Sequence, residues 1–140
     1  MTKTHITIEL CKSVSQNTMV DHLGIEFIEV TPNSISAKMP VDKRTLQPLG
    51  LLHGGASVAL AETLGSIASM LYLDVNRQYP VGVAINASHI KSVADGYVYG
   101  TAKPLHIGRK THVWEIKIVD EDNDMICVSR LTTMIMDKTS

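Results

Sequence analysis

Residues 51–66 read LLHGGASVALAETLGS, and this stretch decides how the rest of the chain is interpreted. Apolar residues continue beyond it, so the sequence predicts one long helix over 54–73. Glu62 carries the only Asp, Glu, Lys or Arg side chain between Arg44 and Asp74. A helix that is apolar on most sides must be covered on most sides, and one flat sheet face cannot do that.

Segments on both sides of this helix have the patterns of β-strands. Residues 24–30 and 34–41 are separated by a Pro-Asn turn signal and predict an antiparallel hairpin. Four further strands are predicted after the helix, at 81–93, 96–107, 111–120 and 125–137. Short connections favour antiparallel neighbours, and therefore a four-strand meander.

Together the elements predict an α+β fold in which a strongly curved antiparallel sheet wraps around one long central helix. Residues 7–22 predict an additional short helix. Either the sheet curls around the central helix or a second subunit closes its remaining side, so we expect an oligomer. The length of 140 residues, without a repeat or linker, predicts one domain over 1–140.

Composition excludes several classes of protein. The formal net charge of -1 argues against a nucleic-acid-binding protein. Cys11 and Cys127 form no C-x-x-C pair, and the chain starts without a signal-peptide pattern, so we expect a cytoplasmic protein with free thiols. The apolar run within 55–73 is too polar to span a membrane. The histidines follow no ligand pattern, so we expect neither a metal nor a cofactor.

Glu62 is the candidate catalytic residue on the predicted helix. A carboxylate among apolar residues requires a hydrogen-bonding partner, and Ser66, one helical turn further on, can supply a hydroxyl. The small residues Ala59 and Gly65 leave space beside it. Partly buried charge next to open space is characteristic of active sites, although a Glu on the solvent side of a half-buried helix is the alternative.

Two glycines at the start of the helix, Gly54 and Gly55, suggest a second functional feature. The first N–H groups of a helix have no internal partner and lie at its positive end, which favours an anion or an oxyanion. A flexible junction is the alternative. Gly55 and Glu62 are two turns apart, roughly 10 Å, which is too far for one small reacting group. An antiparallel second helix across a dimer axis would bring the two features together, so we expect a shared site.

The stretch 39–66, MPVDKRTLQPLGLLHGGASVALAETLGS, resembles the signature of the hotdog-fold acyl-CoA thioesterases. Gln47, the HGG at 53–55, Glu62 and Ser66 stand at the family spacing. The resemblance is greatest to the branch that includes 1,4-dihydroxy-2-naphthoyl-CoA hydrolases, phenylacetate-type thioesterases and the proofreading thioesterases of enterobactin synthesis. It continues through three later segments, at 81–92, 103–116 and 129–135.

The resemblance implies hydrolysis of an acyl-CoA thioester, with aromatic acyl groups favoured, to the free acid and CoA. Gly55 N–H would be the oxyanion donor, while His53 and Gln47 would orient the thioester. Glu62 of the partner chain would be nucleophile or general base, and Ser66 would help to place the water. Two alternatives stay open, an acyl carrier protein thioester as substrate and a non-catalytic acyl-CoA-binding protein. A hydratase or dehydratase lacks its motif here.

The resemblance also implies a homodimer that shares its active site, a homotetramer of two such dimers, and menaquinone biosynthesis as one pathway. CoA enters as part of the substrate and not as a cofactor. Lys91, Arg109 and Lys110 are candidate cations for its phosphates, or else ordinary surface charges. The implied CoA-binding residues are Gly82, His89, Ile90, Lys91, Ser92, His106, Ile107, Gly108, Arg109, Lys110 and Thr111.

Overall fold

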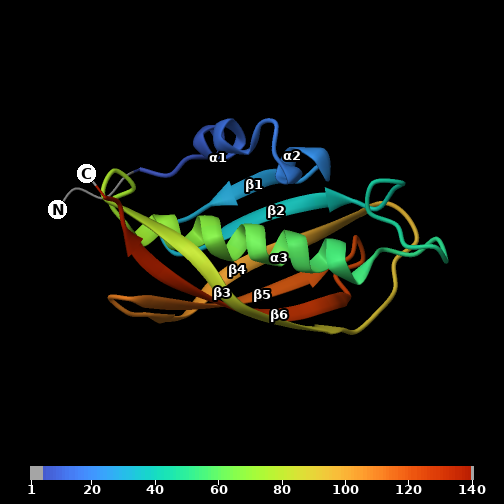
Figure 1. The fold of residues 1–140 in the computed structure, drawn as a ribbon. Coiled ribbons are helices and arrows are strands. Elements are labelled where there is room, and N and C mark those ends of the chain that lie inside the picture. Colours follow the sequence, from blue (N-terminus) through green and yellow to red (C-terminus); the bar gives the residue numbers. More distant parts are fainter. Residues whose placement is uncertain (1–4, 140) are drawn as a thin grey trace.

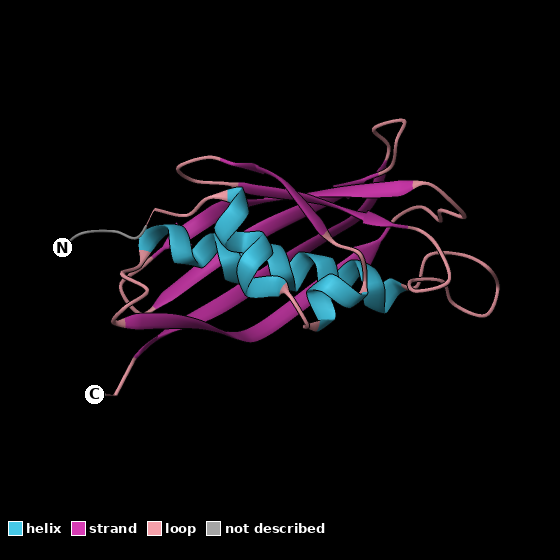
Figure 2. Ribbon diagram, turned by 90° about the horizontal axis from the view of Figure 1, so that it is seen from above, coloured by secondary structure: helices cyan, strands magenta, loops and turns pink. Residues whose placement is uncertain are grey.

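A curved antiparallel sheet wraps around one long helix in the computed structural model, which describes residues 5–139 of the chain. Within that range the sheet has six strands, and the helix is α3 (Gly54–Ser69). Figure 1 shows α3 lying lengthwise against the concave side of the sheet, and Figure 2 shows the helices gathered over the strands. The predicted α+β hotdog architecture is therefore confirmed.

The strands follow one another across the sheet in the order β1-β2-β4-β5-β6-β3, and all pairs are antiparallel. Their bounds are β1 (Glu26–Val30), β2 (Ile35–Pro40), β3 (Gln78–His89), β4 (Tyr97–Ile107), β5 (Thr111–Val119) and β6 (Met125–Asp137). The predicted β1–β2 hairpin and the run from β4 to β6 are confirmed.

The predicted four-strand meander is wrong in one respect, because β3 pairs with β6 and not with β4. The connection between β3 and β4 spans residues 90–96. It must cross three strand spacings, roughly 14 Å at about 4.8 Å each. Seven residues of chain reach farther than that. A connection of this length therefore permits a crossing as well as a tight turn, and the sequence does not distinguish the two.

The core lies between α3 and the inward-facing side chains of the central strands. Trp114, Ile116 and Ile118 alternate along β5 and are fully buried, and each buried aliphatic side chain contributes about 1.5–3 kcal/mol. At Gly100 a Cβ atom would lie 2.8 Å from Cδ1 of Leu64. The absence of a side chain at this position lets α3 approach β4 closely.

The helices differ in two places from the sequence prediction. The expected helix over 7–22 is two helices, α1 (Ile8–Ser15) and α2 (Met19–His22), because Asn17 between them has a φ of 61°. The left-handed conformation of Asn17 ends the first helix. Helix α3 ends at Ser69 and continues only as the 3-10 turn η1 (Met70–Tyr72). No helix within residues 5–139 is long and apolar enough to cross a membrane.

Candidate active site

The start of α3 is capped by a histidine side chain. His53 is the N-cap residue, and its ring Nδ1 accepts a hydrogen bond from Gly55 N–H at 2.7 Å. Because Nδ1 is the acceptor, a neutral His53 ring carries its proton on Nε2. His53 is exposed, so its Nε2–H is a donor that a ligand can use. The Gly55 N–H, which was predicted as an oxyanion donor, is engaged by His53 in this structure.

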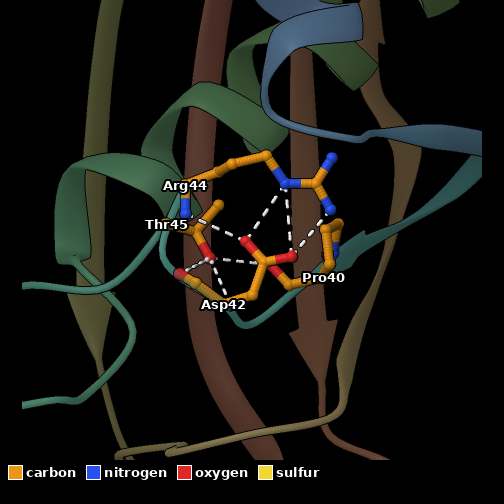
Figure 3. Close-up of polar contacts among 4 residues, drawn as sticks. All are labelled: Pro40, Asp42, Arg44 and Thr45. Carbon is orange, nitrogen blue, oxygen red and sulfur yellow. Dashed lines mark hydrogen bonds and ion pairs between the residues drawn. The ribbon is translucent and has the colours of Figure 1, made fainter.

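A turn at residues 40–45 holds the loop that leads to His53 (Figure 3). The buried Thr45 donates its hydroxyl to the Pro40 carbonyl at 2.7 Å and accepts Asp42 N–H at 3.1 Å. Hydrogen bonds from the side chain and backbone of Arg44 lower the pKa of Asp42 to about 2. The Thr45 carbonyl then accepts His53 N–H at 2.8 Å. Sequence reasoning missed Thr45, although Asp followed by Thr three residues later is a recognisable turn signal.

Gln47 begins a second tight turn in the same loop. Its carbonyl accepts Gly50 N–H at 2.9 Å, and Gly50 has a φ of 78° that favours glycine. The side-chain oxygen of Gln47 accepts Leu49 N–H. With its oxygen held in the turn, the Gln47 side chain offers the hydrogens of its NH2 group as donors.

The segment 89–92 lies beside the start of α3. A cavity of about 250 Å³ separates this segment from Leu52, Gly54 and Ser57. A Cβ atom on Gly54 would lie 2.9 Å from Nε2 of His89, so the glycine makes room for the His89 ring. The structure therefore brings 89–92 together with His53 and Gly55 at one end of the molecule.

Glu62 lies two turns further along α3, where its carboxylate reaches the strand β3. The side chain is half-buried, and its Oε2 lies 2.6 Å from the position of a Cβ atom on Gly82. Gly82, which was predicted to approach CoA, here makes room for the carboxylate of Glu62. Ser66 follows Glu62 by one helical turn, on the same face, and is also half-buried.

The turn at 106–111 lies level with Gly82 and far from the start of α3. Thr133 of β6 pairs with His112 on one side and with Gly82 on the other. His89 is seven residues from Gly82 along β3, which corresponds to roughly 20 Å. The predicted CoA-binding residues therefore form two groups, which lie at opposite ends of the folded molecule.

A buried polar cluster lies behind this turn. His112 is 2% exposed, and its Nδ1 lies 3.0 Å from Ser69 Oγ. The same oxygen accepts Trp114 Nε1–H at 2.8 Å and lies 2.8 Å from Thr133 Oγ1. Burial, with a smaller effect of His106, lowers the pKa of His112. His112 thus has a hydrogen-bonding partner inside the buried cluster, where its lowered pKa favours the neutral ring.

One chain contains two complementary clusters. The helix-start cluster (Gln47, His53 and Gly55) supplies hydrogen-bond donors, and the strand-edge cluster (Glu62, Ser66 and Gly82) supplies a carboxylate. Donors for a developing oxyanion and a carboxylate for an oxygen nucleophile are the requirements of acyl-group hydrolysis. The clusters are roughly 10 Å apart along α3. Among the described residues, no group of three His, Cys, Asp or Glu side chains could hold a metal ion.

Comparisons with known proteins agree with this chemistry. The sequence pattern of the thioesterase superfamily matches residues 49–127. The proofreading thioesterase EntH of Cronobacter turicensis is 50% identical over 134 residues, which cover 96% of this chain and 97% of EntH. The 1,4-dihydroxy-2-naphthoyl-CoA hydrolase of Escherichia coli is 47% identical over 134 residues, 96% of this chain and 98% of that protein. The crystal structure of a Haemophilus influenzae thioesterase has a TM-score of 0.92 at 46% identity, covering 96% of this chain and 94% of that one.

Proposed function

This chain belongs to the thioesterase superfamily and is a thioester hydrolase, and we propose that it hydrolyses an aryl-acyl-CoA to the free acid and CoA. The name of the Escherichia coli relative specifies an aromatic acyl-CoA, which supports this substrate class. The proposal includes menaquinone biosynthesis as one pathway, alongside aryl-CoA catabolism and carrier-protein editing. The observation that carries the catalytic part is the contact between Glu62 and Gly82.

The proposed enzyme is a homodimer, because each chain separates its two clusters. Strand β3 has 12 residues, and within the described range β6 is its only neighbour. Its free edge exposes Tyr79, Val81 and Val83 at 42%, 40% and 51%. Long unpaired edges that expose apolar side chains are normally covered. A second β3 paired here about a twofold axis would run α3 of the partner antiparallel and bring Glu62 to the other helix start. Two such dimers would form the proposed homotetramer.

In this arrangement the thioester oxygen takes the place of His53 Nδ1 as the acceptor for Gly55 N–H. The positive end of α3 stabilises the negative charge that develops on that oxygen. His53 Nε2–H and the Gln47 NH2 group orient the thioester and stabilise the departing thiolate. Loss of one oxyanion donor of this kind typically costs about 2.7–4 kcal/mol of activation energy.

Glu62 acts from the partner chain in one of two ways. As a general base it takes a proton from water, whose oxygen attacks the carbonyl carbon while the C–S bond breaks. As a nucleophile it forms a mixed anhydride that water then hydrolyses. Ser66 helps to hold the water in both cases. Appearance of ¹⁸O in Glu62 after single-turnover hydrolysis in labelled water would identify the anhydride route, because general-base catalysis leaves the carboxylate oxygens in place.

CoA is proposed to bind along both groups of strand-end residues. The exposed Arg109 and Lys110 are the proposed phosphate ligands. The remaining members line the path of the pantetheine arm; they are Gly82, His89, Ile90, Ser92, His106, Ile107, Gly108 and Thr111. The ammonium of Lys91 is already paired, with Asp120 at 2.9 Å and Asp124 at 2.6 Å.

The test is thiol release from benzoyl-CoA, a hydroxylated aryl-CoA, hexanoyl-CoA, palmitoyl-CoA and an aryl carrier protein thioester. We expect the aryl-CoA substrates to react fastest. Glu62→Gln should lower kcat by about 10²–10⁴-fold, the usual contribution of a general acid–base group. Glu29→Gln, at an exposed position on β1, serves as the matched control and should leave kcat unchanged.

Three results would redirect the proposal. If Glu62→Gln has the kcat of the wild type, Glu62 takes no part in the reaction. A preference for palmitoyl-CoA would contradict the aryl substrate class. Faster hydrolysis of the carrier-protein thioester would identify a carrier protein, in place of CoA, as the acyl donor.

A further inference from the structure

Lys91 is held in a pair of contacts that the proposed chemistry does not use. It lies in the connection 90–96 between β3 and β4, and its Nζ donates to Asp124 at 2.6 Å and to Asp120 at 2.9 Å. The hydrogen bonds to Asp124 and then to Asp120 raise the pKa of Lys91. The ammonium is therefore charged throughout the range in which enzymes are assayed.

Asp120 also organises the turn to which Lys91 attaches. Its Oδ1 accepts the N–H groups of Asp122 and Asp124, both at 2.9 Å, while its Oδ2 accepts Lys91. The Asp120 side chain is only 11% exposed, whereas that of Asp124 is 58% exposed. One carboxylate thus shapes the β5–β6 turn with one oxygen and binds the β3–β4 connection with the other.

The backbone of the β3–β4 connection links this turn to the catalytic loop. Ile90 N–H donates to the Ile126 carbonyl at 2.8 Å, just after the β5–β6 turn. Three residues beyond Ile90, the Val93 carbonyl accepts Leu52 N–H at 2.8 Å. Leu52 directly precedes His53, the N-cap of α3. The loops that hold these residues meet at one end of the molecule (Figure 1).

Few other interactions hold the β3–β4 connection in place. Ile90, Lys91 and Ser92 are exposed and lie outside any strand or helix, whereas Val93 and Gly96 are half-buried. An exposed segment of this kind gains little stability from apolar burial. Its position therefore depends on its hydrogen bonds and on the two ion pairs of Lys91.

We propose that Lys91 is a positioning residue, which fixes the 90–93 segment on the 120–124 turn so that Val93 holds Leu52, and through it His53, at the start of α3. This inference rests on the proposed role of His53 in thioester hydrolysis. It replaces the role of phosphate ligand that the family resemblance implied for Lys91. Two of the three N–H donors of Lys91 are engaged by carboxylates, whose negative charges weaken the attraction of its ammonium for a phosphate.

The test compares Lys91→Met with wild type on two substrates that carry the same aryl group. One is the aryl-CoA, and the other is the aryl thioester of N-acetylcysteamine, which has no phosphate. The ion pairs of Lys91 are partly exposed, so their loss should have a modest effect and lower kcat by up to about five-fold. We expect the same factor on both substrates, with less than a two-fold change in KM for the CoA thioester.

A second readout does not require turnover. Hydrogen exchange of the Leu52 amide reports directly on its bond to Val93 and should accelerate about five-fold in Lys91→Met. Asp124→Asn, which leaves Lys91 and the Asp120 turn in place, should change both readouts in the same direction by a smaller factor. Lys117→Met is the matched control, because it removes an exposed lysine paired with Glu115 away from the site.

The opposite pattern would overturn the proposal. If Lys91 binds phosphate, Lys91→Met raises KM for the CoA thioester alone, leaves Leu52 exchange unchanged, and Asp124→Asn tightens CoA binding by freeing the lysine. A wild-type protein that hydrolyses neither thioester would contradict the proposed function instead. In that case the exchange rate of the Leu52 amide still decides whether Lys91 holds the 90–93 segment in place.

Discussion

Replacement of Gly82 by alanine should disable Glu62 while leaving the fold intact. The new Cβ atom would lie 2.6 Å from Glu62 Oε2, whereas ordinary contact begins at 3.4 Å. The carboxylate must therefore retreat by about 0.8 Å. A displacement near 1 Å at a reacting group costs up to about 10²-fold in rate. We expect kcat to fall about 10–100-fold, equivalent to about 1.4–2.7 kcal/mol of activation energy.

Gly82→Ala should affect the stability of the fold much less than it affects kcat. The obstructing atom is the end of a flexible side chain, and Gly82 does not adopt a positive φ. We expect the free energy of unfolding in urea to change by less than about 1 kcal/mol, because alanine also restricts the unfolded chain. Aryl-CoA turnover and urea unfolding, measured on the same preparation, separate the two effects.

Two variants give this experiment its controls. Gly100→Ala creates a contact of 2.8 Å with the buried Leu64, on the opposite side of α3. It should destabilise the fold by about 1–3 kcal/mol without moving Glu62. In a Glu62→Gln background, Gly82→Ala should lower the residual rate by less than about two-fold, since both changes act on one group. Wild-type kcat in Gly82→Ala, or an undiminished effect in the Glu62→Gln background, would refute the reasoning.

Two further predictions concern stability. Thr45→Val removes the hydroxyl that donates to the Pro40 carbonyl and accepts Asp42 N–H, and should lower the free energy of unfolding by about 1–3 kcal/mol. Thr45→Ser keeps the hydroxyl and is the control. Equal losses of stability in both variants would contradict this explanation. Burial lowers the pKa of His112, so below about pH 6.5 the unfolded chain binds a proton that the native state does not. The free energy of unfolding should therefore decrease as the pH falls below about 6.5, by up to about 1.4 kcal/mol per pH unit. Urea unfolding between pH 5.5 and 7.5 measures that slope, and an equal slope in His112→Gln would assign it to other groups.

The elements of the candidate site could be predicted because their signals are local. A continuous apolar helix that carries one carboxylate, and a pair of glycines at its start, are visible within 51–66. Strand alternation is equally local, since side chains on successive residues point to opposite faces. The spacing of Gln47, His53, Glu62 and Ser66 resembles that of the hotdog-fold thioesterases and so predicts thioester hydrolysis.

The failures have different physical origins. Strand β3 joins β6 across the sheet, and local alternation carries no information about which distant strand a segment pairs with. The break at Asn17 depends on one residue with a positive φ, and asparagine adopts that conformation only in some contexts. The strand pairing therefore depends on the packing of whole elements, whereas the helix break depends on the conformation of a single residue.

The sequence by itself determined the helix, the strands and the candidate reactive groups, because helix and strand periodicities depend on neighbouring residues. Only the tertiary structure decided which of those groups meet. The contact of Glu62 with Gly82 and those of Lys91 with Asp120 and Asp124 join segments 20 or more residues apart in the chain. The separation of the two groups of predicted CoA-binding residues follows from the strand register. Such contacts are set by the path of the folded chain, which depends on the packing of every element at once.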